Sequence, residues 1–209
     1  MLTVIANNIF IQSIADYHQN NDVNCLINNP YPQERLEHLL YLNNWTNTVL
    51  WHLEDLVRNP QINPLEGLAI KRRIDKTNQY RNDIAEFIDS FLLNKYQNIK
   101  PQENARINTE TPAWAIDRLS ILALKIYHME QETLRKDVDN NHILTCQQKL
   151  EVLLNQRQDL SQAIEELIED IEAGRCYMKT YKQMKMYNDP SLNPILYSKG
   201  QHSPTLTSC

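Results

Sequence analysis

Residues 111–129 read TPAWAIDRLSILALKIYHM, and on a helix this stretch is apolar on nearly every side. Thr111 is a favourable N-cap residue, and Pro112 suits the first helical position, where its missing N–H needs no partner. A helix that is apolar all round is typical of a protein interior, so we predict that this one lies at the centre of a helical domain. Unpaired buried charges cost several kcal/mol, so its polar side chains need partners from other helices. These side chains are Asp117, Arg118, Lys125 and His128.

Apolar residues at helical spacing predict four further helices around this stretch. We expect them at residues 3–18, 32–59, 64–96 and 141–173. The boundaries come from Pro32 and Pro64 at first-turn positions, and from Gly174 as a C-terminal cap. The fold class is therefore all-α, and we expect an antiparallel bundle of four long helices with a short N-terminal helix and a C-terminal extension. The bundle domain would span residues 1–187, and residues 188–209 would form an irregular tail.

Composition excludes several classes of protein. The 209 residues include only three glycines and no phosphate-loop or dinucleotide motif, which argues against doubly wound folds. Residues 1–174 hold 16 basic and 25 acidic residues, so we expect no nucleic-acid binding by the main body. No CxxC pair, signal peptide or run of about 20 apolar residues is present. We therefore expect a cytoplasmic protein with reduced thiols and no membrane span.

Two arginines occupy positions where the periodic pattern predicts apolar residues. Arg81 interrupts the stripe of the helix at 64–96, and Arg157 interrupts the seam of the helix at 141–173. Glu54 and Asp117 lie at similar spacing on two other helices, so we expect all four side chains at one level of the bundle. Such a polar layer either fixes the register of the helices or lines a ligand pocket.

A second candidate site is a set of acids on adjacent helices. Glu54 and Asp55 form a doublet, and Glu86 and Asp89 form an ExxD pair. Mg²⁺ prefers oxygen ligands, so these four carboxylates are candidate magnesium ligands. The pattern partly resembles that of the all-helical nucleotide pyrophosphohydrolases, although the third acid of that family's first helix is missing. The alternative is a solvated acidic face, which is common on helices.

The basic and aromatic segment at residues 175–187 also has two interpretations. Interleaved lysines and tyrosines can hold phosphates and stack on bases. We favour the alternative, in which the tyrosines pack on the bundle and the lysines stay in solvent. The histidines show no HxxxH or HExxH spacing, so we interpret His52 and His128 as hydrogen-bonded core residues.

Three parts of the chain together resemble a known family. They are LWHLEDLVR (50–58) with NQYRNDIAEFID (78–89), then residues 107–129, and then residues 178–194. They resemble the bacterial domain-of-unknown-function family four-two-five-four (DUF4254) over nearly the whole chain. This resemblance implies a cytosolic, all-helical protein of unassigned activity, encoded near glycosyltransferases for cell-envelope sugars. The positions that match its motifs are Trp51, His52, Glu54, Asp55, Arg58, Arg81, Asn82, Asp83, Asp117, Arg118, Lys125 and His128.

We therefore expect a non-catalytic bundle that binds a partner or a small anionic ligand in support of cell-envelope glycan synthesis. Basic residues would hold the anion and acids would orient them; these residues are Arg81, Arg118, Lys125 and Arg157, with Glu54 and Asp117. The rival prediction is a Mg²⁺-dependent nucleotide or nucleotide-sugar pyrophosphohydrolase that uses the four acids as metal ligands. A glycosyltransferase or another protein is the expected partner, and the long seam also favours a homodimer.

Overall fold

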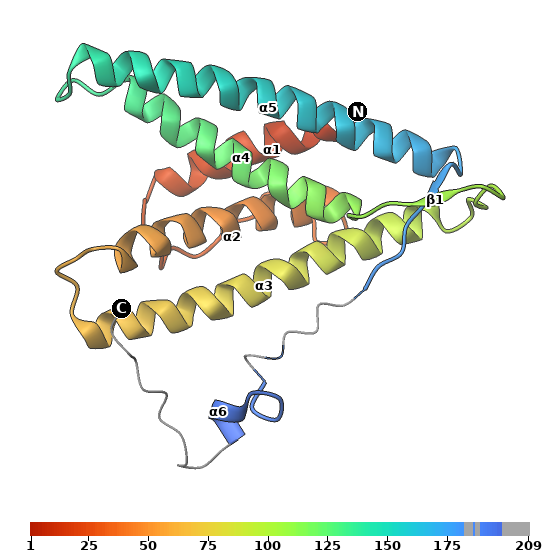
Figure 1. Ribbon diagram of the computed structural model, residues 1–209, viewed down its shortest axis with the longest axis horizontal. Coiled ribbons are helices and arrows are strands. Elements are labelled where there is room, and N and C mark those ends of the chain that lie inside the picture. Colours follow the sequence, from red (N-terminus) through yellow and green to blue (C-terminus); the bar gives the residue numbers. More distant parts are fainter. Residues whose placement is uncertain (182–185, 187–188, 198–209) are drawn as a thin grey trace, which may run out of the picture.

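The computed structural model describes residues 1–181, 186 and 189–197, and most of this chain is helical (Figure 1). The elements are α1 (Leu2–His18), α2 (Leu36–Val57), α3 (Pro64–Tyr96), β1 (Arg106–Ile107), α4 (Pro112–Thr133), α5 (Asn140–Glu172), β2 (Cys176–Tyr177) and α6 (Pro194–Tyr197). The all-α prediction is thus confirmed. Parts of the predicted 175–187 segment and most of the predicted tail lie outside the described residues. Among the helices that are described, none has the length and apolar content needed to cross a membrane.

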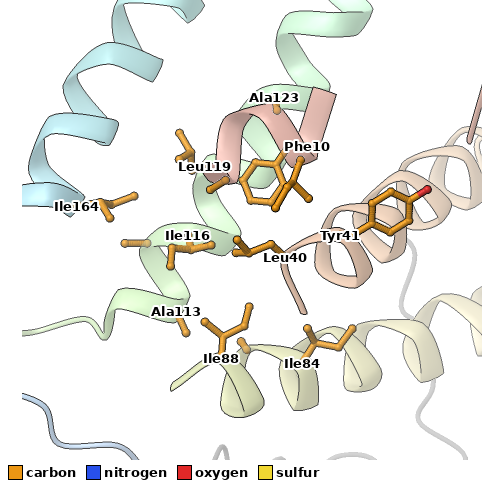
Figure 2. Close-up of a cluster of buried hydrophobic side chains, with 14 of the residues drawn as sticks. Phe10, Leu40, Tyr41, Ile84, Ile88, Ala113, Ile116, Leu119, Ala123 and Ile164 are labelled. Carbon is orange, nitrogen blue, oxygen red and sulfur yellow. The ribbon is translucent and has the colours of Figure 1, made fainter. Parts of the chain in front are cut away.

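One hydrophobic core is shared by α1 through α5, and α4 lies at its centre. α4 packs against each of the other four long helices. Its Ile116 and Leu119 are fully buried, and Figure 2 shows them among Phe10 of α1, Leu40 of α2 and Ile88 of α3. The central place predicted for residues 111–129 therefore agrees with the structure. α1, expected as a short N-terminal helix, supplies part of the same core.

Local sequence signals set several helix ends where they were predicted. α3 begins at Pro64, and the Asn63 side chain accepts hydrogen bonds from two N–H groups of its first turn. α4 begins at Pro112. Gly174 follows the end of α5 with a φ of +70°, a left-handed conformation that favours glycine.

The predicted start of the second helix at Pro32 is wrong. A turn, closed by the Arg35 N–H donating to the Pro32 carbonyl at 3.1 Å, comes first. Arg35 is then extended, with φ −96° and ψ 146°, and α2 begins at Leu36. The periodic apolar pattern of residues 32–59 predicts that Leu56 is buried, but this residue at the C-terminal end of α2 is 47% exposed.

The buried face of α2 is polar in its middle. Asn43, Asn44 and Asn47 are buried together with their partners on α4. Asn43 and Asn47 both donate to Asp117 Oδ1, at 2.9 and 3.0 Å. Asn44 donates to Ser120 Oγ at 3.0 Å. Buried polar groups are stable when they are hydrogen-bonded, so these contacts fix the register of α2 against α4.

α5 is buried along only part of its predicted seam. Ile164 and Ile171 are buried, and so is Cys146 near the other end of the helix. Leu153 and Arg157, between them, are only partly buried. α5 packs chiefly against α4, with a smaller contact to α1, so its middle is covered on one side.

A short parallel strand pair joins the linker after α3 to the chain that leaves α5. β1 pairs with β2, and the Gln102 N–H donates to the Gly174 carbonyl at 2.9 Å. At the same end, Tyr96 Oη of α3 donates to Glu172 Oε1 of α5 at 3.0 Å. The end of α3 with the linker that follows it is therefore fastened to the distant end of α5, at one end of the molecule (Figure 1).

The Asp117 hydrogen bonds can be tested by mutation. Asp117→Ala should lower the free energy of unfolding by about 1–3 kcal/mol, because the buried Asn43 amide loses its acceptor and the Asn47 amide is left with Ser120 Oγ and the more distant Asn43 Oδ1. Asp117→Asn keeps one acceptor oxygen and should cost less than half as much. Urea unfolding measures both values. A cost for Asp117→Ala below about 0.5 kcal/mol, typical of surface substitutions, would contradict the role of Asp117 in fixing this interface.

Candidate functional site

Two of the four residues expected in a polar layer meet in one pocket. Glu54 of α2 and Arg81 of α3 line a cavity of about 330 Å³ between α2, α3 and α4. Asp117 lies instead in the α2–α4 interface, where asparagine amides occupy its Oδ1. Arg157 lies on the partly buried middle of α5 and does not line the pocket. The structure therefore brings together Glu54 and Arg81, but not Asp117 or Arg157.

The pocket has a charged side and an apolar side. It is lined by Asn47, Leu50, Trp51, Glu54, Asp55, Arg58, Asn78, Arg81, Ile121 and Leu124. The charged side comes mainly from the last turns of α2, where residues three and four apart share a face. The apolar side comes from α4 and from the preceding turn of α2. A ligand here would contact both charged groups and an apolar surface, as is usual in small-molecule sites.

The guanidinium groups of Arg81 and Arg58 differ in their hydrogen-bond partners. Arg58 Nη1 donates to Glu54 Oε2 at 2.6 Å, in an ion pair along α2. Arg81 is partly buried, and its Nε is buried without a hydrogen-bond partner. A buried donor without a partner costs about 1–3 kcal/mol. Arg81 therefore lines the pocket and also carries a buried donor that has no partner among the described residues.

The four acids of the predicted magnesium site do not share one point. Glu54 and Asp55 line the pocket, whereas Glu86 and Asp89 do not. Within the described part of the chain, no three of these carboxylates place oxygens close enough together to hold one ion. The structure therefore offers no magnesium site built from this set.

Asp89 instead caps the central helix. Its side chain is buried, and its Oδ1 accepts a hydrogen bond from the Ala113 N–H in the first turn of α4, at 3.2 Å. Thr111, the predicted N-cap, has the expected extended backbone, but its side chain makes no capping bond. The cap of α4 therefore comes from α3. The sequence around Thr111 does not indicate this contact.

Two other predicted ligand residues have their own partners. Asp83 Oδ1 accepts from Gln79 Nε2 at 2.9 Å, one turn earlier on α3. Arg118 is exposed and pairs with Glu110 at 2.6 Å, near the start of α4. Neither side chain reaches the pocket between α2, α3 and α4.

Trp51 separates this pocket from a second cavity. The second cavity, of about 460 Å³, is lined by Trp51, Lys125 and His128 among others. The indole of Trp51 stacks on the His128 ring, with centroids 4.5 Å apart and an interplanar angle of 8°. Lys125 is exposed at this cavity. Lys125 and His128 thus line a different cavity from Arg81, and Trp51 lines both cavities.

His52 and His128 form a group with a third histidine, His18, which the sequence pattern did not indicate. The Nε2 atoms of His18 and His52 are 3.2 Å apart. His128 Nε2 is buried without a hydrogen-bond partner, so the interpretation of His128 as a hydrogen-bonded core residue does not hold for that atom. The three residues come from α1, α2 and α4, so no linear spacing could reveal them.

A model of the family described as "Protein of unknown function (DUF4254)" matches residues 37–180. The chain belongs to this family. No curated protein and no solved structure shows a significant match to it. In this DUF4254 protein, the matched range includes every residue that lines the pocket around Arg81. It also includes His52 and His128, but His18 on α1 precedes it.

Removal of the Asp89 cap should destabilise this DUF4254 protein. Asp89→Ala leaves the Ala113 N–H buried without an acceptor, so the free energy of unfolding should fall by about 1–2 kcal/mol. Asp89→Asn keeps an acceptor oxygen and should cost less than about 0.5 kcal/mol at neutral pH. Urea denaturation of both variants measures the difference. Equal losses for the two variants would contradict the capping role.

A pH series separates the charge of Asp89 from its role as an acceptor. Burial raises the pKa of the Asp89 carboxyl above its ordinary value of 3.8. The unfolded chain therefore ionises first, and the wild type loses stability as pH rises from 3.8 through the folded-state pKa. Asp89→Asn lacks this loss, so its stability relative to wild type should be higher at about pH 7 than at about pH 3. A constant difference between the two pH values would contradict this.

Proposed function

We propose that this protein binds a small anionic ligand in the pocket between α2, α3 and α4, with Arg81 as the principal contact. The observation that supports this proposal is that the pocket is lined by Arg81, a guanidinium whose Nε has no hydrogen-bond partner in the described part of the chain. A phosphate or carboxylate oxygen is the acceptor that best matches a guanidinium, because charge-assisted hydrogen bonds to such groups are short and strong.

The other lining residues narrow the class of ligand. Glu54 and Asp55 accept hydrogen bonds and repel a second anionic group, although Glu54 is partly neutralised by Arg58. Hydroxyl groups of a sugar are suitable donors to these carboxylates. The pocket volume of about 330 Å³ lies at the small end of the range for ligand sites. A phosphorylated sugar therefore fits the chemistry better than a polyanion does.

A role in cell-envelope glycan synthesis would supply such a ligand in the cytoplasm, where sugar phosphates are made. We therefore propose that the protein acts there as a non-catalytic binding partner, for example of a glycosyltransferase. The magnesium-dependent pyrophosphohydrolase receives no comparable support, since Asp89 is engaged by α4 and the other acids do not converge with it.

Ligand titration with charge-matched variants tests the role of Arg81. Glucose 1-phosphate should raise the thermal unfolding temperature of the wild type, whereas methyl glucoside, which lacks the phosphate, should not. Arg81→Met should weaken glucose 1-phosphate binding by roughly 10–100-fold, the loss expected for about 1.5–3 kcal/mol of charged hydrogen bonding. Isothermal titration calorimetry measures the change.

Arg72→Met provides the matched control, since Arg72 is exposed on the same helix and does not line the pocket. It removes the same charge and should leave binding within about twofold of wild type, because exposed charges contribute little. If Arg81→Met stabilises the fold and leaves glucose 1-phosphate binding intact, Arg81 only sets helix register. If glucose 1-phosphate does not bind the wild type, the proposed ligand class is wrong.

A further inference from the structure

Three histidine rings from three helices surround a common point. His18 ends α1, His52 lies on α2 and His128 lies on α4. Their ring centroids are 5.2, 5.6 and 5.8 Å apart in pairs, and every pair is edge-on, with interplanar angles of 66–71°. Each ring offers one nitrogen to a set of three atoms that all lie within 4.8 Å of one another.

Hydrogen bonding sets the orientation of the His18 ring. Its Nδ1 lies 2.7 Å from the Ile14 carbonyl oxygen, which can only accept, so we assign the proton to Nδ1. His18 Nε2 then presents a lone pair towards His52 Nε2, 3.2 Å away. An Nδ1–H bond to a backbone carbonyl is the usual outer contact of a histidine that binds a metal through Nε2.

Aromatic neighbours hold all three rings in place. Trp51 stacks on His128, and Tyr17 stacks on His52 with centroids 5.2 Å apart and an interplanar angle of 6°. Tyr127 lies against His18, with centroids 4.4 Å apart. Ligands whose rotamers are fixed by packing lose little entropy when they bind an ion. The group is therefore preorganised around its centre.

One ring nitrogen of the group lacks a partner in the part of the chain that the structure describes. His128 Nε2 is buried and makes no hydrogen bond there, so the group has a free ligand nitrogen besides the Nε2 atoms of His18 and His52.

The geometry points to a zinc site formed by His18, His52 and His128. At a Zn–N distance of about 2.0–2.1 Å, two ligands of a tetrahedral zinc are roughly 3.3–3.4 Å apart. The separation of 3.2 Å between His18 and His52 is close to that value, and His128 needs only a small movement. Imidazole ligands favour Zn²⁺ over Mg²⁺ or Ca²⁺. Three protein ligands leave the fourth tetrahedral position to water or an anion.

The second cavity lies beside the histidine group. His128 lines this cavity of about 460 Å³, so one member of the ligand set borders an open space. Arg81 lies in the other pocket, beyond Trp51, and takes no part in the histidine group. The zinc site and the proposed anion site are therefore separable by mutation.

A second group, Glu132, His142 and Cys146, also brings three potential ligand atoms within 4.8 Å. Its members already bond one another and their surroundings. His142 Nε2 lies 3.0 Å from Glu132 Oε2 and 3.4 Å from Cys146 Sγ. Glu132 is also paired with Arg135 at 3.0 Å. No buried polar atom of this group lacks a hydrogen-bond partner. The group is still a competing metal site, so the experiment must distinguish it from the three histidines.

Zinc binding to the full-length chain tests the proposal. After treatment with EDTA, the protein is titrated with Zn²⁺ in competition with a chromophoric chelator. We expect one tight equivalent. His52→Gln and His128→Gln should each lower the Zn²⁺ affinity by at least roughly 10–100-fold. That is the loss caused by removing a residue that only hydrogen-bonds to a ligand, and these variants remove a ligand itself. His38→Gln, which alters a histidine outside the group, and Cys146→Ala should leave the affinity unchanged.

Cobalt substitution gives a readout that does not depend on the histidine variants folding. Co²⁺ in the wild type should show tetrahedral d–d absorption without a thiolate-to-metal charge-transfer band. Zn²⁺ should also raise the thermal unfolding temperature of wild type and of Cys146→Ala equally. A thiolate band, loss of binding in Cys146→Ala, or failure of the wild type to retain any Zn²⁺ would overturn the proposal. Arg81→Met should still bind zinc, so failure of the anion site and failure of the zinc site give different results.

Discussion

The hydrogen bonds from Asn43 and Asn47 to Asp117 are the contacts on which the two candidate sites depend. They join the middle of α2 to the middle of α4 at the centre of the core. Hydrophobic packing alone tolerates small slips between helices, but a buried amide and carboxyl must meet within about 3 Å. A displacement of one helical turn, about 5.4 Å, would leave these groups buried without partners. The register of α2 against α4 is therefore set by polar contacts.

That register places functional side chains opposite one another. Trp51, one turn beyond Asn47 on α2, reaches His128 of α4, and the neighbouring His52 reaches both His18 and His128. The same part of α2 carries Glu54 towards the pocket that Arg81 lines from α3. The anion pocket and the histidine group thus lie on either side of one aromatic residue, whose position the asparagines fix.

The positions of most helices follow from local chemistry and were predictable. Pro64 and Pro112 begin helices where a missing N–H costs nothing, and Gly174 ends one where only glycine adopts the backbone comfortably. Pro32 carries the same signal but begins a turn, because proline is equally suited to both. Apolar periodicity identified α4 as the centre. It also located α2, but it missed the polar part of the buried face, because buried asparagines resemble a solvent-facing surface until their partners on α4 are known.

The sites were less predictable than the helices, because they depend on contacts between distant segments. Arg81 was identified because a charge in an apolar stripe is a local anomaly. The proximity of Glu54 followed from its place on the adjacent helix. The sequence around Asp89 does not indicate that it caps another helix. The sequence around His18 does not indicate that its ring meets His52, 34 positions later in the chain. Such relations arise from the three-dimensional path of the chain, which periodicity in a single helix does not encode.

The strand pair β1–β2 makes the two ends of the molecule mechanically unequal. At its end, backbone hydrogen bonds and the Tyr96–Glu172 contact clamp α3, the linker and α5 together. The α2–α3 and α4–α5 connections lie at the opposite end (Figure 1), and so do the last turns of α2 and α4 that carry Glu54 and His128. The strand pair therefore holds the end of α3 against the end of α5, and these two helices diverge towards the end that carries the anion pocket and the histidines (Figure 1). Their separation at that end is set by how they pack against α2 and α4, and not by the strand pair.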